Sequence, residues 1–353
     1  MQGIIHLLFG GHPPPVLMLD SLDSVLSELE EILPPELSGI TADTAALTER
    51  VGIRAWISEI ASVLRGEAGA VGSFLLTLLV ITTLSALLSA LGGRAQEMGS
   101  VAMGILIAFL SFGRIAELFG EVTKALSSLV TFFGGLIPII YTVTLSGGGV
   151  AASSVQATGM GITLSVIGGG FITALSAASG LGLAASVLSV FGDHSLHFSR
   201  GLRSLFGWLL GISTTLLLGT LSLQRVMSSA ADSAAIRAGR YALSGMIPVV
   251  GGTVSGALST LASGLSYVKG VVGVSSVLAI VTVAVAPLLS LLLYRLALSL
   301  SGSYAELLGA RTAASTFTSL RAVLDTVIAT YALAAVIMLL EIILFVKGEV
   351  AIG

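Results

Sequence analysis

Residues 125–192 read ALSSLVTFFGGLIPIIYTVTLSGGGVAASSVQATGMGITLSVIGGGFITALSAASGLGLAASVLSVFG, a run of 68 residues without one Asp, Glu, Lys, Arg or His. About 20 apolar residues in a helix cross the hydrocarbon core of a bilayer, so this run can hold three crossings, or two crossings and a re-entrant segment. A soluble domain of this size could not hide such a run from water. The run predicts a multi-pass membrane protein.

The composition of the whole chain agrees with this prediction. Of the 353 residues, 55% are hydrophobic and 10% are charged, whereas soluble domains carry about 25% charged residues. The predicted fold class is all-α: a polytopic transmembrane helical bundle of about 7–9 membrane segments, some of them re-entrant, with a small amphipathic-helical N-terminal region.

The charges divide the chain into two predicted regions, an acidic region at 1–68 and a multi-pass membrane domain at 69–353. Residues 1–67 contain ten Asp and Glu against three Arg. An amphipathic helix that starts at Asp20 and stops at Pro34 is expected there as a small exposed element. Because cytoplasmic loops collect Lys and Arg, we expect the acidic region outside the cytoplasm and Arg94 inside. The absence of clustered Lys and Arg argues against nucleic-acid binding.

Nine apolar stretches are candidate crossings, and their alternation across the bilayer conflicts with the charge rule at one point. This alternation places Arg225, Arg237 and Arg240 outside the cytoplasm, whereas Lys and Arg normally collect in cytoplasmic loops. One of the stretches is therefore expected to be re-entrant or interfacial, unless the rule fails in this chain. The nine stretches are Ala70–Leu91, Met98–Phe119, Ala125–Leu145, Val150–Gly170, Phe171–Phe191, Ser204–Leu223, Gly245–Gly264, Val271–Tyr294 and Thr326–Val346.

A weak internal repeat joins the regions around 125–160 and 235–270. GGLIPII at 134–140 resembles SGMIPVV at 244–250. Paired helices interrupted by Pro and Gly are typical of the pathway in internally repeated transporters. We therefore expect broken segments around Pro138 and Pro248 to face each other and line or plug a passage; two proline kinks in ordinary packed helices are the alternative. The expected passage or gate residues are Gly135, Pro138, Asp232, Arg237, Arg240, Pro248, Gly251 and Gly252.

Two further features concern packing and buried charge. Small residues at positions 207, 211, 215 and 219 fall four apart, as they do at 252, 256, 260 and 264, and such ridges favour close helix packing inside the protein, with self-association as the alternative. Glu341 lies in an apolar stretch six residues before Lys347. We interpret it as reaching the membrane interface, because a charge at mid-membrane is costly.

No catalytic constellation stands out, so the chain is not expected to be an enzyme. His194 and His197 lack the further ligands of a zinc site and are interpreted as a solvated or headgroup-facing loop. The chain has no cysteine, which excludes a disulfide framework and a thiolate metal site. No cofactor and no metal are expected.

A series of short motifs lies between about residues 204 and 300. They are Trp208-Leu-Leu-Gly211, Leu218–Gln224, Ala231-Asp232, Ile236-Arg237, Ile247–Gly252, Val271-Val-Gly273 and Pro287–Leu289. Together they resemble the stage III sporulation protein AE family of endospore-forming bacteria. The acidic region followed by many crossings fits the layout of that family. The chain departs from the family pattern in two places: a convincing signal peptide is missing at the start, and Gly256-Ala257 stands where the family often carries an acidic residue.

The resemblance implies a multi-pass protein of the mother-cell membrane that surrounds the forespore. Its expected partners are the lipid bilayer and the other subunits of a trans-envelope channel, or feeding-tube, complex, including a cytosolic ATPase and ring-forming membrane proteins. Within that complex we expect an export-gate or permease-like core. Two alternatives stay open, a stand-alone secondary transporter of a small solute and a purely structural scaffold. Homo-oligomer formation also stays open.

Overall fold

The computed structural model describes residues 16–34, 37, 53–90, 92–146, 150–188, 190, 204, 207–208, 211–215, 217–222 and 251–347. Within these residues the regular secondary structure is helical throughout, which confirms the all-α prediction. The elements are α2 (Val16–Ile32), α4 (Ile53–Ala90), α5 (Gly93–Ser146), α6 (Val150–Ser165), the π-helix η2 (Val166–Phe171), α7 (Ile172–Leu188), α9 (Gly251–Leu307) and α10 (Arg311–Lys347).

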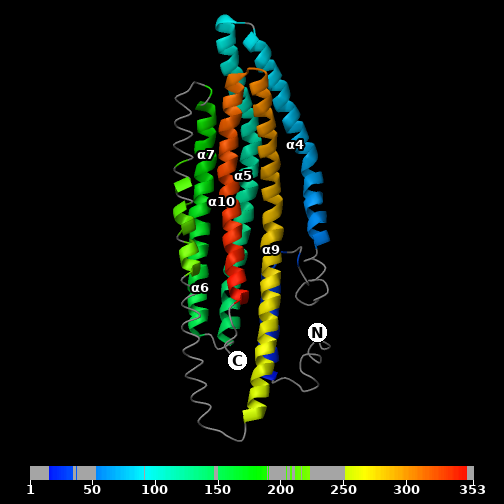
Figure 1. Ribbon diagram of the computed structural model, residues 1–353, viewed down its shortest axis with the longest axis vertical. Helices are drawn as coiled ribbons and strands as arrows, with labels where there is room; N and C mark the ends of the chain where they lie inside the picture. Colours follow the sequence, from blue (N-terminus) through cyan, green and yellow to red (C-terminus); the bar gives the residue numbers. More distant parts are fainter. Residues whose placement is uncertain are drawn as a thin grey trace.

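The long helices lie side by side along one axis (Figure 1). From the upper end of α4 the chain turns back into α5, and from the lower end of α5 it returns through α6, η2 and α7. Helix α9 then rises beside α4, and α10 descends between α9 and α7. Gly92, Gly93 and Gly309 carry the turns with φ of 73°, 66° and 72°, values that cost little without a Cβ.

Five of these helices are long and apolar enough to cross a membrane, by length and composition. The chain is therefore a multi-pass membrane protein, as expected. The apolar stretches are Ile57–Ala90, Gln96–Ser146, Ala152–Ala177, Leu265–Leu307 and Arg311–Lys347.

Two expected loops between crossings are not present. The stretches expected at Met98–Phe119 and Ala125–Leu145 form one helix, α5, which has 54 residues. Those expected at Val150–Gly170 and Phe171–Phe191 are joined through η2. Helix α5 therefore continues past the charged residues at 117–124. An unbroken helix pairs every backbone group internally. Similarly, α4 passes through residue 68, the expected boundary between the two regions, without a break.

Helix α5 also continues through Pro138, so the expected break at this proline is wrong. A proline removes one backbone N–H from the helix, and the hydrogen bonds on either side hold the remaining turns. Pro138 is exposed on the outer surface of α5. Gly135 faces α2 instead: a Cβ there would lie 2.9 Å from Cγ2 of Ile32.

The N-terminal amphipathic helix α2 is present as expected, but it is not a freely exposed element. Its apolar residues Val25 and Leu29, and Leu33 directly after it, are buried in the core shared with α5 and α9, and its acidic residues Glu28 and Glu31 face outward. The contact at Gly135 shows why: the missing side chain of this glycine leaves room for Ile32.

A second proline lies inside α9, and a tyrosine compensates for it. Pro287 has no N–H to donate to the carbonyl of Val283, four residues earlier. The hydroxyl of Tyr331 in α10 donates to that carbonyl oxygen at 3.3 Å. Tyr331 is buried, so the orphan carbonyl is paired inside the protein, and α9 continues over 57 residues.

Candidate functional site

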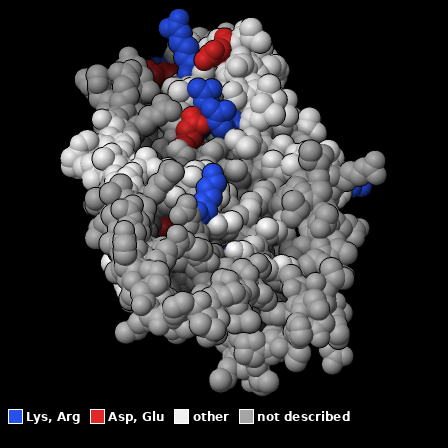
Figure 2. Space-filling model, turned by 60° about the horizontal axis from the view of Figure 1, so that its bottom comes forward, with Lys and Arg blue, Asp and Glu red and all other residues white. Residues whose placement is uncertain are grey.

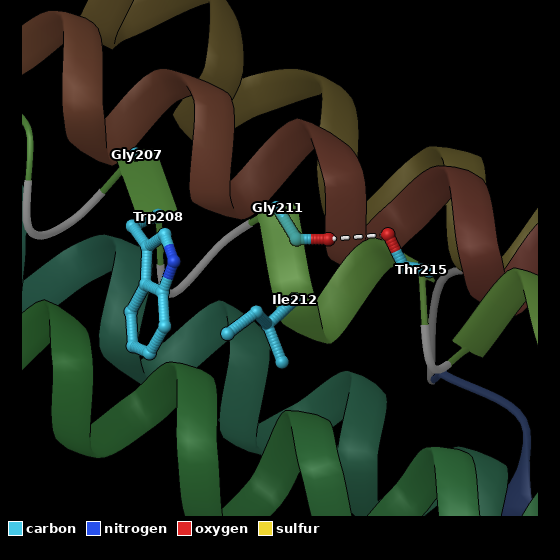
Figure 3. Close-up of a pocket in the computed structure, with 5 residues that line it drawn as sticks. All are labelled: Gly207, Trp208, Gly211, Ile212 and Thr215. Carbon is cyan, nitrogen blue, oxygen red and sulfur yellow. Dashed lines mark hydrogen bonds between the residues drawn. The ribbon is translucent and has the colours of Figure 1, made fainter.

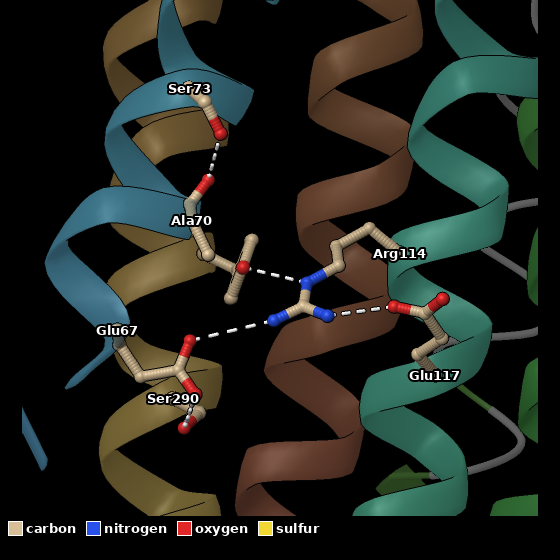
Figure 4. A network of polar contacts seen from close by, with 7 residues as sticks. Glu67, Ala70, Ser73, Arg114, Glu117 and Ser290 are labelled. Atoms are coloured by element: carbon tan, nitrogen blue, oxygen red, sulfur yellow. Dashed lines mark hydrogen bonds and ion pairs between the residues drawn. The ribbon is translucent and has the colours of Figure 1, made fainter.

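Arg114 of α5 is the centre of a polar network that joins three helices (Figure 4). Its Nε donates to the hydroxyl oxygen of Tyr294 in α9 at 2.6 Å, and its Nη1 to Oε2 of Glu117 at 2.7 Å. Its Nη2 lies 3.5 Å from Oε2 of Glu67 in α4. The other oxygen of Glu67 accepts a hydrogen bond from Ser290 at 3.2 Å. Each of the three guanidinium nitrogens thus contacts a different side chain, and these side chains come from α4, α5 and α9.

Aromatic contacts hold the guanidinium in place. Arg114 Cζ lies 4.9 Å from the ring centroid of Tyr294, within the range of a cation–π interaction. The ring of Phe74 in α4 packs edge-on against Tyr294, with centroids 5.3 Å apart. A pocket of about 320 Å³ lies beside this network, lined by Ala70, Ser73, Phe74, Thr77, Leu78, Leu110, Arg114 and Tyr294.

A second set of charges lies at the same level on α9 and α10. Nε of Arg295 donates to Oδ1 of Asp325, and Arg321 donates to Ser299 at 3.3 Å. Because Tyr294 and Arg295 are neighbours in α9, this pair and the Arg114 network form one level across the bundle. We call the group formed by Glu67, Arg114, Glu117, Arg295 and Asp325 the polar belt.

Two ionisable side chains are buried near the other end of α10. Glu341 is 0% exposed and accepts a hydrogen bond from the Thr163 hydroxyl of α6 at 2.8 Å. Lys269 of α9 is 6% exposed, and its ammonium nitrogen lies 5.5 Å from the ring centroid of Phe345. Phe345 follows Glu341 by one helical turn, so α6, α9 and α10 meet at a polar centre. Glu341 is thus enclosed by the bundle, and its expected position at the membrane interface stays a prediction.

The expected passage residues are only partly within the described chain. Gly135 and Pro138 lie in the unbroken helix α5, as given above. Gly251 and Gly252 are the first two residues of α9. The remaining four, Asp232, Arg237, Arg240 and Pro248, lie outside the described residues, and so do His194 and His197. Whether the two prolines face each other stays a prediction.

The ridge of small residues at 207–219 borders an open pocket of about 680 Å³ (Figure 3). Gly207, Trp208, Gly211, Ile212 and Thr215 line it. No described atom comes within 4 Å of a Cβ built at Gly207, Gly211 or Gly219. The internal packing expected of this ridge is thus not seen at these three glycines in the described part of the chain.

Arg114 and Glu117 are not among the residues expected from the sequence to form a site. Their contacts Glu67, Ser290 and Tyr294 lie far away along the chain. The available signal was the rarity of charge inside apolar helices, since such residues usually contact one another or a functional group. That signal marks the residues but not their partners.

Long apolar helices with ionisable side chains paired between them define a class, the multi-pass helical membrane proteins with internal polar centres. The chain belongs to the stage III sporulation protein AE family, whose model matches residues 39–348. Over 286 residues it is 21% identical to Stage III sporulation protein AE of Bacillus subtilis (strain 168), which covers 78% of this chain and 72% of that protein. No solved structure matches. The resemblance drawn from the short motifs is confirmed.

Proposed function

We propose that this protein is an integral membrane component of the sporulation trans-envelope channel complex between mother cell and forespore. In this proposal it is an export-gate or permease-like core and not an enzyme. Its membership of a sporulation protein family over residues 39–348 supports a role in sporulation. Its five long apolar helices support the location in a membrane. The acidic N-terminal region would lie outside the mother-cell cytoplasm.

The observation that carries the gate role is the buried polar centre of Glu341, Thr163 and Lys269. A charged group inside an apolar bundle costs several kcal/mol or more unless it is compensated. Such groups typically mark ion or solute pathways and the helices that move around them. Here three helices, α6, α9 and α10, meet at two ionisable side chains. A change in these contacts would alter how the three helices pack.

A gate of this kind would act with partners. The proposed partners are ring-forming membrane proteins, which would continue the passage across the space between the two membranes, and a cytosolic ATPase, which would supply energy. Co-purification from sporulating cells, followed by identification of the captured proteins, tests this part of the proposal. Recovery of the chain without any other sporulation membrane protein would count against it.

The gate role itself is tested with Glu341→Gln, which keeps the size of the side chain and removes its charge. We expect late forespore gene expression, read with a fluorescent reporter, to fall strongly while the protein stays in the membrane at normal level. The matched control is Glu306→Gln, because Glu306 is exposed at the end of α9. Normal reporter activity in Glu341→Gln, with the protein at wild-type level, would contradict the gate role.

A stand-alone secondary transporter is the second candidate, and the same buried carboxylate favours it, since intramembrane carboxylates serve ion coupling. The two candidates differ in what the purified protein does alone. Ion-coupled solute uptake by liposomes that contain only this chain would support the transporter. The channel-component proposal expects no such uptake without partners.

A further inference from the structure

Helix α2 is docked on the bundle at the level of the buried polar centre. A Cβ at Gly135 of α5 would lie 3.4 Å from Cβ of Ile32, the last residue of α2. The neighbouring Gly134 faces α6 instead, where its Cβ would lie 3.6 Å from Cδ2 of Leu164. Thr163, the residue before Leu164, belongs to the polar centre. The end of α2 and the polar centre therefore lie within about one helical turn of each other along the bundle axis.

This level lies in the middle of an uncharged part of α5. Residues 125–146 contain no charged side chain, and Gly135 lies about 15 Å from either end of them, which is half of a hydrocarbon core of about 30 Å. Two other helices present apolar side chains to the outside at this level. Ile162 of α6 is 38% exposed and Ile343 of α10 is 40% exposed. On these sides the bundle needs an apolar surrounding, which the acyl chains of a bilayer provide.

The outward face of α2 is polar and acidic at the same level. Its exposed residues Ser24, Ser27, Glu28 and Glu31 follow one another at helical spacing, and we call them the acidic face. Helix α2 contains no Lys or Arg. On the long helices, by contrast, acidic and basic side chains lie beside one another in the upper and central part of the face shown in Figure 2. Carboxylates that face hydrocarbon are costly, so the acidic face needs water.

Two different surroundings are thus required at one level of the bundle. Helix α2 packs against α5 and α9. In Figure 1 it is the dark blue helix partly hidden by the lower half of α9, whereas α6 lies toward the opposite edge of the bundle. Lipid on the side of α6 and water on the side of α2 satisfy both requirements. An amphipathic helix suits such a position, because its apolar face covers the bundle while its polar face stays hydrated.

We propose that the acidic face of α2 forms one wall of a water-filled passage within the membrane, on the side of the bundle formed by α5 and α9. The passage opens toward the acidic N-terminal region, and hydrated solutes that enter it move along Glu28 and Glu31. This inference rests on the proposed function, because lipid would fill the space beside α2 unless another subunit of the complex formed the opposite wall. Water inside a membrane persists only where protein encloses it.

Single-cysteine variants test the surroundings of each position, because the chain has no cysteine of its own. Glu28→Cys and Glu31→Cys report on the acidic face. Ile162→Cys and Ile343→Cys are the matched controls, since they are exposed at the same level on α6 and α10. Membranes from sporulating cells, in which the complex stays assembled, are treated with a charged, water-soluble maleimide. The full-length chain is then immunoprecipitated, and its modification is followed over time.

We expect both α2 cysteines to be modified at least about ten times faster than both controls, because only the thiolate reacts and a thiol among acyl chains stays protonated. Slow modification at the α2 positions would overturn the proposal, since the acidic face would then not face water. Fast modification at the controls would also overturn it, because this level of the bundle would then lie outside the membrane. Ser27→Cys and Val336→Cys replace any variant that does not reach the membrane.

A cross-link tests whether α2 stays docked in the membrane. The 3.4 Å between Cβ of Ile32 and the Cβ position of Gly135 is close to the spacing of about 3.5–4.5 Å between the Cβ atoms of a disulfide. The double variant Ile32→Cys with Gly135→Cys, oxidised with copper phenanthroline in the same membranes, is expected to form an intrachain disulfide and to lose its reaction with maleimide. Two thiols that stay reactive would show that α2 leaves the bundle, against the proposal.

The labelling pattern and the gate role can fail separately. Fast labelling of the α2 cysteines together with normal reporter activity of Glu341→Gln would refute the gate role and leave the water-facing wall in place. Slow labelling of the α2 cysteines together with lost reporter activity of Glu341→Gln would refute the wall alone.

Discussion

The close contact of α7 with α10 at Gly182 makes a sharp prediction. A Cβ at this position would lie 2.6 Å and 2.7 Å from the two γ-carbons of Val323. Atoms do not approach so closely, and a β-branched valine in a helix has one strongly preferred rotamer. Gly182→Ala is therefore expected to push the two helices apart. Gly180, two residues earlier, has no described atom within 4 Å of its Cβ position and is the matched control.

The magnitudes follow from two opposing terms. Alanine in place of glycine inside a helix stabilises it by about 0.5–1 kcal/mol, and an overpacked methyl group costs about 1–3 kcal/mol. Gly180→Ala should therefore raise the free energy of unfolding slightly. Gly182→Ala should lower it by about 1 kcal/mol, the difference between the central values of the two terms.

Thermal unfolding of the purified protein in detergent, followed by circular dichroism, measures both variants against the parent chain. We expect the midpoint of Gly182→Ala to fall and that of Gly180→Ala to stay equal or rise. The double variant Gly182→Ala with Val323→Ala is expected to recover part of the loss, because it removes both clashing γ-carbons. Equal midpoints for the two single variants would refute the contact of α7 with α10.

Three further predictions concern other contacts. Arg114→Met leaves two carboxylates without their guanidinium and should cost about 1–2 kcal/mol of stability, measured by the same thermal assay; no loss would mean that the network does not hold α4. Tyr331→Phe leaves the Val283 carbonyl without its donor and should cost about 1 kcal/mol of stability. An unchanged midpoint of thermal unfolding would contradict this prediction. The third prediction concerns the orientation of the chain in the membrane. A membrane-impermeant maleimide added to intact protoplasts should label Glu31→Cys and not Glu97→Cys. The opposite labelling would place the acidic N-terminal region in the cytoplasm.

Much of the fold could be predicted from the sequence because hydrophobicity acts locally. The uncharged run at 125–192 has no other stable solution than helices in an apolar surrounding. The period of apolar residues similarly predicted the amphipathic helix α2, although the burial of its apolar face, including Leu29, was not expected. Where the helices end was harder to predict. The gap expected between Met98–Phe119 and Ala125–Leu145 contains Glu121 and Lys124, yet nothing in these charges breaks a helix, and α5 continues.

The candidate site could be predicted only in part, because its partners come from distant positions. The hydrogen bond of Arg114 to Tyr294 joins residues 180 positions apart, and that of Thr163 to Glu341 joins residues 178 apart. No local pattern encodes such a pairing. The role of Pro138 was misjudged for a related reason: a proline inside a long helix is tolerated where the neighbouring turns and helices hold the backbone.

The π-helix η2, with its three consecutive glycines Gly168–Gly170, contains one more residue than an α-helical turn would need. A residue removed from an ordinary helix rotates every side chain after it by about 100° around the axis. Removal of one glycine from η2 can instead be absorbed, since the widened turn relaxes to α-helical geometry and the side chains of α7 keep their direction. The continuous helical segment formed by α6, η2 and α7 can thus lose one residue within η2 while Gly182 still contacts Val323.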